Sequence, residues 1–480
     1  MYIRELHIDG LKLLRNFELS FTRDGEPRMW TVLVGRNGLC KTSILRAIAL
    51  AASGRDLANE LSSGMRPSLR DCRRQDPLTI QAEFDFGPVG YAEGRTLPHF
   101  EMARPILDSH LELLPAERAF SSHSSWQERP PTAHEVHVSY AEQAEAQAWH
   151  RGHAKEGSES PPEGDSAEFE EFVLPSPLDT ARSQSLPHWF VAGYGVNRNV
   201  PLPFDASHSK RDPLLARVSS LFDGSPLIAT GFSEKFRGAE LEVYSRLLDL
   251  VMANNEGLIP GVRGVSLSNG GATRSSDVDM AHRLRMRTGA HDVEVPSTWL
   301  SHGYQATVSW LADLVGHILW ERSENNLELT ADPSKMEGLV LIDELDLHLH
   351  PSWQVGLIPA LKQIFPRLQF VVTTHSEMLL AGLEGDEIVM LDQDPSTGDI
   401  TQHSDPRPAK LMTGTEMLAR YFGVRDLHPV NLSKQMYLYG RLASDPERSD
   451  DEDLEVQSIY SELEAAGVAP DWKPVPRRTK

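Results

Sequence analysis

The stretch TVLVGRNGLCKTS, Thr31 to Ser43, decides the fold of this chain. The apolar run TVLV predicts a buried strand, and the segment from Thr42 to Ala52 predicts a helix that ends at Gly54. The turn between them contains Gly35 and Gly38. A buried strand that leads through a glycine-containing turn into a helix is typical of the phosphate-binding loop of α/β proteins.

A phosphate loop needs inward-facing backbone N–H groups, a lysine that reaches the terminal phosphates and a hydroxyl for magnesium. The pattern G-x-x-x-x-G-K-[ST] is met at Gly35, Lys41 and Thr42, but Cys40 replaces its second glycine. A chance strand-turn-helix is the alternative. If the loop is functional, these residues contact the nucleotide: Gly35, Arg36, Asn37, Gly38, Leu39, Cys40, Lys41, Thr42 and Ser43.

A second element is LVLIDE, in which four apolar residues precede Asp343 and Glu344. In open α/β sheets ligands bind at the carboxyl ends of the strands. We expect Asp343 to hold Mg²⁺ together with Thr42, and Glu344 to orient and deprotonate an attacking water. An ordinary solvated acidic turn is the alternative.

Two further motifs follow the same logic. In LSHGYQ, Ser301 can cap a helix, and Gly303 would let the backbone approach a phosphate. The following helix is amphipathic, and its apolar residues are Val308, Leu311, Leu314, Val315, Ile318 and Leu319. In VVTTHS, His375 ends an apolar strand, where it could contact a terminal phosphate. An ordinary N-cap and a satisfied polar histidine are the alternatives.

The bulk composition narrows the class of protein. The chain has 480 residues, a formal net charge of −22 and only two cysteines, Cys40 and Cys72. The cysteine count excludes a disulfide framework, and the negative net charge argues against general electrostatic binding of nucleic acid. Two basic segments, RPSLRDCRRQ and HRLRMR, could still contact nucleotide, nucleic acid or an acidic partner locally. A solvated face is the alternative for each. No apolar run has membrane-spanning length and no signal peptide is visible, so we predict a cytoplasmic protein.

The pattern along the chain predicts five segments and a parallel sheet with crossover helices. Strands and one helix fill 1–100, an insertion that we expect to be partly disordered fills 101–180, and the rest of the first lobe with a helical lobe fills 181–295. Residues 296–400 hold the amphipathic helix and two buried strands, GLVLID and QFVVTTH, separated by a helix. Residues 401–480 form a helical extension. We expect it to bind a partner, with the helix EVQSIYSELEAAG as the candidate surface and packing of that helix on its own head as the alternative.

Together the four motifs resemble those of the ABC-type ATPase head: Walker A GRNGLCKT, signature LSHGYQ, Walker B LVLIDE and a switch histidine, His375. The opening YIRELHIDGLKLLRNFELSF resembles the first hairpin of SMC, RecF and OLD-type heads. IDELDLHLHPSWQ and its spacing to VVTTHSEMLL are most similar to the bacterial "AAA family ATPase" group of OLD-like proteins. The resemblance covers residues 1–100 and roughly 185–395.

This resemblance implies an α/β fold with a mixed sheet and a helical signature lobe, and it implies ATP and Mg²⁺ as ligands. Two heads would dimerise around ATP, with Ser301 and Gly303 of one head capping the nucleotide held by the other. Lys41, Glu344 and His375 would be the catalytic residues, and Asp346 would match the D-loop. The glutamine of the Q-loop is not placed by the sequence. Gln184 is a candidate and Arg198 could sit near phosphate, but a structural role is the alternative for both.

Other features suggest sites that we discount. Asp392 and Asp394 in LDQDPSTGD resemble a Toprim nuclease D-x-D, but DPSTGD is good turn chemistry and predicts a plain hairpin. His348 and His350 have alternate spacing without an evident third metal ligand.

Two functions remain open. The first is an ATPase that senses a signal and regulates a separate effector, a nuclease or toxin, in antiphage defence, as the resemblance to OLD-like ATPases implies. The second is a DNA-repair or recombination ATPase that clamps DNA directly. The lobe sizes and LSHGYQ disfavour a third, a transporter subunit.

Cys40 decides whether the loop works. We expect tolerance if its φ is negative and the Cβ points away, and we read the site as active because the other motifs are intact. A thiol at a helix N-terminus can also have a lowered pKa, which would make the loop redox-sensitive.

Overall fold

The computed structural model describes most of the chain. The described residues are 1–85, 105–128, 189–198, 213–253, 258–267, 283–288, 291–324, 328–404, 407–424 and 430–476, with single gaps at 116, 118, 226, 408 and 469. They divide into two compact units, Met1–Met412 and Thr413–Lys480. Residues 401–412, which we expected in the extension, therefore belong to the first unit. Gln184 and much of 101–180 lie outside the described residues.

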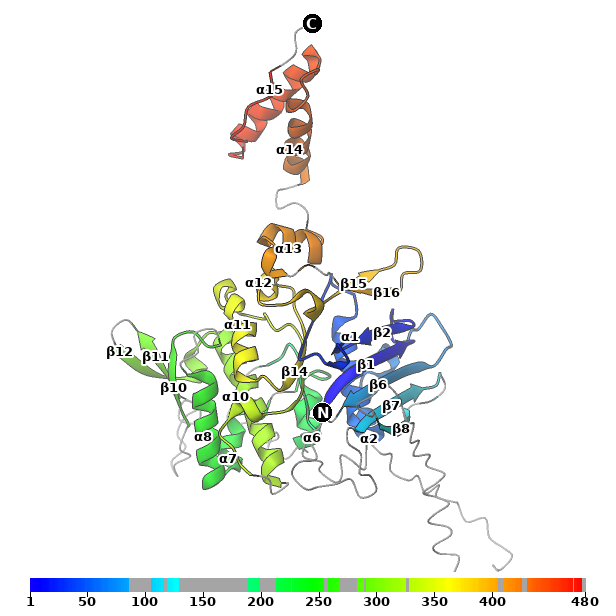
Figure 1. The fold of residues 1–480 in the computed structure, drawn as a ribbon, viewed down its shortest axis with the longest axis vertical. Coiled ribbons are helices and arrows are strands. Elements are labelled where there is room, and N and C mark those ends of the chain that lie inside the picture. Colours follow the sequence, from blue (N-terminus) through cyan, green and yellow to red (C-terminus); the bar gives the residue numbers. More distant parts are fainter. Residues whose placement is uncertain are drawn as a thin grey trace, which may run out of the picture. The chain divides into compact units, whose positions relative to one another are not determined.

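The central element of the first unit is a six-stranded sheet (Figure 1). Its order is β16 (Ile400–Ser404), β15 (Ile388–Gln393), β5 (Trp30–Val34), β14 (Leu368–Thr373), β13 (Gly338–Ile342) and β9 (Val191–Tyr194). All neighbours pair in parallel except β16, which is antiparallel to β15. The parallel arrangement predicted from the apolar runs is confirmed, and the carboxyl ends of β5, β14, β13 and β9 share one edge.

A second sheet is antiparallel and has the order β2 (Phe17–Ser20), β1 (Tyr2–Asp9), β6 (Leu78–Asp85), β7 (Pro105–Leu113) and β8 (Ser121–Glu128). The strands β7 and β8 lie at the start of the segment 101–180, for which we predicted an insertion that is only partly disordered. In β7, Leu107 and Leu111 are buried, so the strand extends the core, and the polar residues between them mask the apolar alternation in the sequence.

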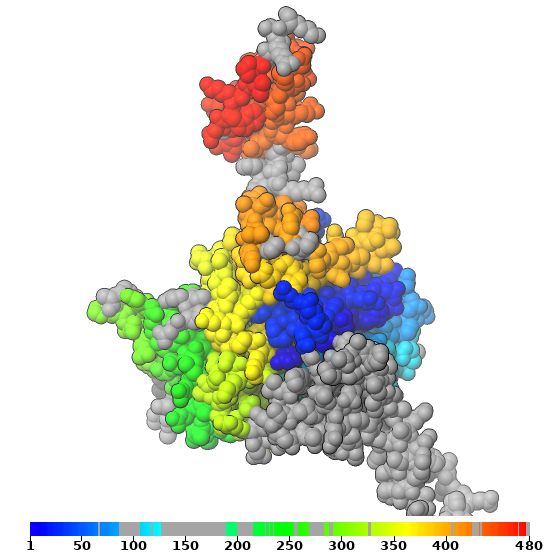
Figure 2. Space-filling model, viewed as in Figure 1, coloured from blue at the N-terminus to red at the C-terminus, as the bar shows by residue number. Residues whose placement is uncertain are grey.

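Helix α1 (Lys41–Ser53) joins the two sheets because it is apolar on almost all sides. Its residues share one core with β1, β6 and β7 of the second sheet and with β13 and β14 of the first. The helix ends at Gly54, whose φ of 75° is left-handed. The residue ranges 1–30 and 340–370, drawn in blue and yellow, lie side by side in Figure 2, and the Tyr2 hydroxyl donates to the Arg367 carbonyl.

The remaining elements of the first unit surround these sheets. The long helix α10 (His302–Glu324) is buried along most of its length and packs on α8 (Ala239–Met252). The helices and 3₁₀ turns are α2 (Arg55–Ser62), α3 (Arg66–Leu69), α6 (Pro213–Ser219), η3 (Ala229–Gly231), α7 (Phe232–Lys235), η4 (Ser297–Trp299), η5 (Pro333–Lys335), α11 (Pro351–Ile364), α12 (Glu377–Leu380), η6 (Gly385–Glu387) and η7 (Ala409–Leu411). The small sheets are β3 (Thr22–Arg23) with β4 (Glu26–Pro27), and β10 (Val262–Ser266), β11 (Arg283–Thr288) and β12 (His291–Pro296).

The second unit contains α13 (Gly414–Tyr421), α14 (Val430–Ala443) and α15 (Asp450–Ala465). Helix α15 begins with a capping box between Ser449 and Glu452. Its apolar residues Val456, Ile459 and Leu463 pack on α14 in a small core of their own. The apolar face of α15, which we predicted to bind a partner or to pack on the head, is therefore covered by α14.

Among the described residues, no helix combines the length and the apolar character that crossing a membrane requires.

Candidate functional site

The turn between β5 and α1 has the backbone of a phosphate loop. Gly35 has a φ of 151°, and a β-carbon there would lie 2.8 Å from the Leu391 carbonyl oxygen. Gly38 has a φ of 87°, which favours glycine. The side chains of Arg36 and Asn37 are exposed, whereas Leu39 is buried in the core beneath the loop. The loop is thus anchored at Gly35 and Leu39 and open between them.

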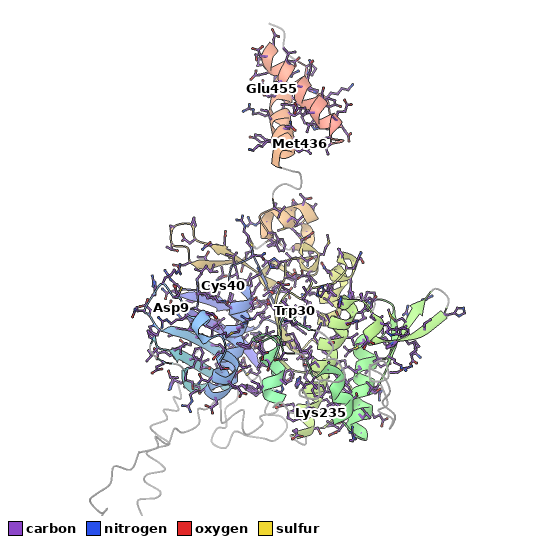
Figure 3. The ribbon with its side chains drawn as sticks, turned by 180° about the vertical axis from the view of Figure 1, so that it is seen from behind. Asp9, Trp30, Cys40, Lys235, Met436 and Glu455 are labelled. Carbon is purple, nitrogen blue, oxygen red and sulfur yellow. The ribbon has the colours of Figure 1, made fainter. Side chains whose placement is uncertain are left out.

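Cys40 has a φ of 57°, in the left-handed region, directly before the first residue of α1 (Figure 3). This corrects our condition that a tolerated cysteine has a negative φ: the backbone keeps the conformation of the missing glycine. The side chain is half-buried, with Sγ 3.9 Å from the Gly38 carbonyl oxygen. Burial raises the pKa of the Cys40 thiol, against weaker lowering by the Leu13 backbone and Lys12. This direction is opposite to the lowered pKa that a position at a helix N-terminus can give.

The Lys41 ammonium is folded back onto its own loop. Its Nζ donates to the carbonyl oxygens of Gly35 at 2.7 Å and Arg36 at 3.1 Å. Burial lowers the pKa of Lys41, while Asp343 and Glu344 oppose that shift. An anion in the loop would offer this amine a charged partner in place of two carbonyls.

Ser43 accepts a hydrogen bond from the Lys12 ammonium at 3.0 Å. Lys12 belongs to the turn between β1 and β2 and has a φ of 53°. The sequence analysis did not identify Lys12, because nothing in GLKLLRN indicates that this turn folds over the start of α1. A second cation therefore lies beside the loop.

The carboxylate of Asp343 joins three elements. Oδ2 accepts from the Thr42 hydroxyl at 2.8 Å, and Oδ1 accepts from the Thr373 hydroxyl at 2.7 Å. A threonine oxygen and a carboxylate oxygen side by side suit Mg²⁺, which takes oxygen ligands and is usually completed by phosphate and water. No group of three or more His, Cys, Asp or Glu side chains that could hold a metal occurs among the described residues. The donor set therefore fits a magnesium ion shared with a phosphate ligand.

Glu344 follows with a left-handed backbone, φ 48°, and a half-buried side chain. Its N–H donates to Thr373 Oγ1 at 2.7 Å, and its carbonyl accepts from the Arg198 guanidinium at 2.5 Å. Arg198, which the sequence left between a phosphate neighbour and a structural residue, is therefore at the acidic end of β13.

Asp346 contacts the end of β14 in its own chain. Its Oδ1 accepts from the Thr374 hydroxyl at 2.6 Å and from the His375 N–H at 3.2 Å. The side chain of His375 is exposed just beyond β14. The loop after β13 and the loop that carries the histidine are thus tied together.

The LSHGYQ motif lies at the start of α10. Ser301 is exposed, and the helix begins at His302. Gly303 is buried, and a β-carbon there would lie 2.4 Å from the His348 carbonyl oxygen. This close approach lets α10 pack against the turn after β13, and the expectation that Gly303 also lets backbone approach a phosphate stays a prediction.

The discounted features have structural roles. Strands β15 and β16 form the hairpin predicted over LDQDPSTGDI, and Asp394 accepts from Ser396 and Thr397 in its turn. His350 caps α11 by accepting from the Ser352 N–H.

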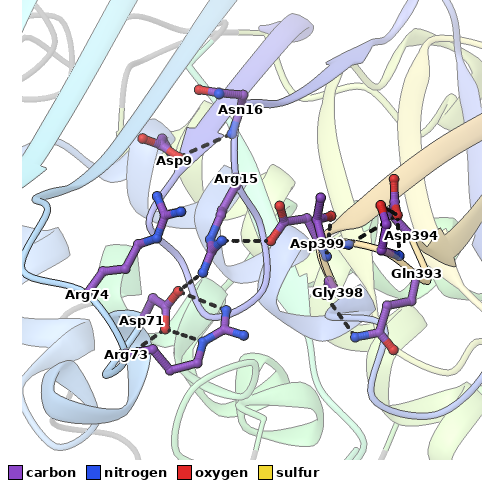
Figure 4. A network of polar contacts seen from close by, with 12 residues as sticks. Asp9, Arg15, Asn16, Asp71, Arg73, Arg74, Gln393, Asp394, Gly398 and Asp399 are labelled. Carbon is purple, nitrogen blue, oxygen red and sulfur yellow. Dashed lines mark hydrogen bonds and ion pairs between the residues drawn. The ribbon is translucent and has the colours of Figure 1, made fainter.

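Acidic residues accompany both basic segments. Asp71 pairs with Arg73 at 2.8 Å and with Arg15 at 2.9 Å, and Arg15 also contacts Asp399 (Figure 4). These arginines, Arg73 first, hold the pKa of Asp71 well below its usual range. In β11, Arg285 and Arg287 stand opposite Glu294 and Asp292 of β12. Neither segment presents a purely basic surface within the described residues.

The strand–loop–helix of α1, the acids at the end of β13 and the parallel sheet define a P-loop ATPase of the α/β class. A family described as "AAA domain, putative AbiEii toxin, Type IV TA system" matches residues 30–381, and the chain belongs to this family. The match begins with β5 and ends just after α12, so it includes the loop, Asp343, Glu344, Ser301 and His375 but not Lys12.

Two curated relatives are informative. The chain is 22% identical over 471 residues to the Septu protein PtuA of Bacillus mycoides (strain KBAB4), covering 96% of this chain and 50% of the relative. It is 38% identical over 103 residues to the Retron Ec83 probable ATPase of Escherichia coli, covering 21% of this chain and 18% of the relative. The chain thus spans half the length of the first relative and less of the second.

Among solved structures, an SMC head bound to the C-winged helix domain of ScpA is 16% identical, covers 86% of this chain and 100% of that chain, and has a TM-score of 0.45. A score this low does not establish a shared fold, so the class rests on the family and on the site.

Proposed function

We propose that the chain binds ATP with Mg²⁺ in the loop from Gly35 to Ser43. The observation that carries the proposal is the hydrogen bond between Thr42 and Asp343, residues 301 positions apart in sequence. Folding brings together a hydroxyl at the start of the loop helix and a carboxylate at the end of a neighbouring strand. Thr42 and Asp343 would hold Mg²⁺ through their oxygens, and the ion would supply charge neutralisation for the β- and γ-phosphates.

Hydrolysis would depend on Glu344. Its position one residue after Asp343, at the same sheet edge as the loop, suits a general base that deprotonates the attacking water. Lys41 would exchange its two carbonyl partners for phosphate oxygens. His375, exposed beyond β14, would contact the γ-phosphate.

Assembly would complete the site. We propose that two copies close on ATP, with Ser301 of one copy reaching the nucleotide of the other; the exposure of Ser301 at the start of α10 supports this. Gly303 would contribute by seating α10 against His348, and Asp346 by linking the closing surface to His375.

The role that we propose is regulation of a separate effector, a nuclease or toxin, in antiphage defence. The support is the similarity to a Septu protein and to a retron ATPase. Direct clamping of DNA is the alternative. It is disfavoured by the net charge of −22 and by the acids that face both basic segments.

The test is the variant Glu344→Gln. We expect ATP hydrolysis to fall about 100-fold or more, because a positioned general base contributes about 10²–10⁴-fold. ATP binding should remain, and ATP-bound dimers should accumulate in light scattering. A variant that hydrolyses ATP at the wild-type rate would overturn the assignment of the site.

Asp392→Asn is the matched control, because Asp392 is an exposed acid in strand β15 of the same sheet. It should leave hydrolysis unchanged. Rates are measured with and without duplex DNA, and strong stimulation of the isolated protein by DNA would favour the clamp over the regulator.

A further inference from the structure

Arg198 is a buried cation that the nucleotide-binding pattern does not use. It lies four residues beyond the end of β9, and only 2% of its surface is exposed. Between them, the Gly195 N–H donates to Ser220 Oγ at 3.0 Å, which anchors the segment against the end of α6. A β-carbon at Gly195 would lie 2.1 Å from the Ser220 carbonyl oxygen, so this close approach depends on glycine. The backbone that leads to Arg198 is therefore fixed.

The pairing of β9 with β13 brings Arg198 to the acidic edge. Tyr194 is in register with Ile342, and the Asp343 N–H donates to the Tyr194 carbonyl at 2.8 Å. Burial lowers the pKa of Arg198 to about 10, although Asp343 and the other nearby carboxylates oppose the shift. The guanidinium therefore stays charged at neutral pH.

The contact of Arg198 is with the backbone of Glu344. Its Nη2 donates to the Glu344 carbonyl oxygen, while the Glu344 N–H donates to Thr373 Oγ1. A φ of 48° is sparsely populated by residues with a β-carbon and persists only where surrounding contacts impose it. Here the peptide groups on both sides of the Glu344 α-carbon are held, one by a strand-end hydroxyl and the other by a buried guanidinium.

We propose that Arg198 is a positioning residue for ATP hydrolysis. It holds Glu344 in the left-handed turn, so that the carboxylate faces the attacking water instead of being displaced with the turn. The proposal rests on the proposed role of Glu344. Arg198, which follows the strand that pairs with β13, thus acts through the backbone of the base.

The experiment compares Arg198→Ala and Arg198→Lys with wild type in three measurements: kcat, the dissociation constant of ATP, and unfolding by denaturant. We expect Arg198→Ala to lower kcat about 10-fold or more while the dissociation constant changes by less than about 3-fold, because only the positioning of the base is lost. Arg198→Lys keeps a charge and a donor and should recover part of kcat. Arg28→Ala, which removes a half-buried guanidinium at the opposite end of β5, should leave kcat unchanged.

The double variant Arg198→Ala with Glu344→Gln separates the outcomes. If Arg198 acts through Glu344, single-turnover hydrolysis by the double variant should equal that of Glu344→Gln alone. A further loss in the double variant, or an ATP dissociation constant that rises as kcat falls, would overturn the positioning role. An unchanged kcat in Arg198→Ala, measured beside an inactive Glu344→Gln, would also overturn the positioning role. Wild-type hydrolysis by Glu344→Gln would instead overturn the proposed function.

Discussion

The left-handed backbone of Cys40 makes a quantitative prediction for Cys40→Gly. A residue with a β-carbon in this region costs about 1–2 kcal/mol relative to the right-handed one. Glycine removes that cost, but ordering a more flexible residue costs about 0.5–1 kcal/mol. The half-buried thiol also loses part of its burial, which is less than about 1 kcal/mol. These terms nearly cancel, so we expect a free energy of unfolding within about 1 kcal/mol of wild type and retained ATP hydrolysis.

Cys40→Val is the informative comparison. A β-branched side chain with positive φ is a genuine outlier, and we expect this variant to lose about 1–3 kcal/mol of stability. Unfolding by denaturant, followed by circular dichroism, measures both variants. A valine variant as stable as wild type would refute the left-handed conformation, and a glycine variant that loses hydrolysis would show that the thiol has a function.

Alkylation tests the same residue chemically. Because burial raises the pKa of the Cys40 thiol, little thiolate is present at neutral pH, and an alkylating reagent should modify the exposed Cys72 first. Slow loss of ATP hydrolysis should follow modification of Cys40, and Cys40→Gly should abolish that loss. Inhibition that persists in Cys40→Gly would locate the sensitive group elsewhere. Peptide mass spectrometry reports both rates.

Two further predictions concern α10. Gly303→Ala should lower the free energy of unfolding by about 1–3 kcal/mol, because its β-carbon would meet the His348 carbonyl at 2.4 Å; an unchanged unfolding curve would show that α10 does not press on this turn. Burial raises the pKa of Asp313 to about 7 and lowers that of His317 well below its usual value. Between about pH 4 and 7, folded Asp313 binds a proton that the unfolded chain does not, so it stabilises the fold on acidification, whereas below about pH 6.5 His317 has the opposite effect. Asp313→Asn removes the first contribution, so its stability relative to wild type should fall by up to about 1.4 kcal/mol per pH unit on acidification in that window. Parallel pH profiles in denaturant titrations would contradict this assignment.

The sequence predicted where candidate residues lie in the fold when local pattern and sheet topology agree. The apolar runs QFVVTTH and LVLIDE predict parallel strands. The carboxyl ends of parallel strands lie at one edge of the sheet. That reasoning predicted Asp343 and Glu344 at one edge beside the loop that carries Thr42, but it did not single out Thr373, which contacts both acids in the structure. Each of these residues is next in sequence to the strand or helix that positions it.

The sequence could not predict contacts that depend on which distant strands become neighbours. Arg198 meets Glu344, 146 positions away, only because β9 pairs with β13. Lys12 meets Ser43 only because a turn of the antiparallel sheet folds over α1. The expectation for Cys40 was wrong for another reason. The sequence gives the residue type but not the backbone angle, and Cys40 has a positive φ of the kind that favours glycine.

The contacts and the conformation that the sequence did not predict share one feature, a positive backbone φ at a residue other than glycine. Seven non-glycine residues in the described part of the chain have a positive φ, and four of them border the candidate site: Lys12, Cys40, Glu344 and His348. Three of them make a close contact, with the Lys12 amine on Ser43, the Glu344 backbone between Thr373 and Arg198, and the His348 carbonyl against Gly303. Residues in sparsely populated conformations cluster where a protein is shaped for chemistry. Cys40 is therefore one of several strained positions around the loop, and its departure from the glycine pattern is consistent with a site that is built to act on a nucleotide.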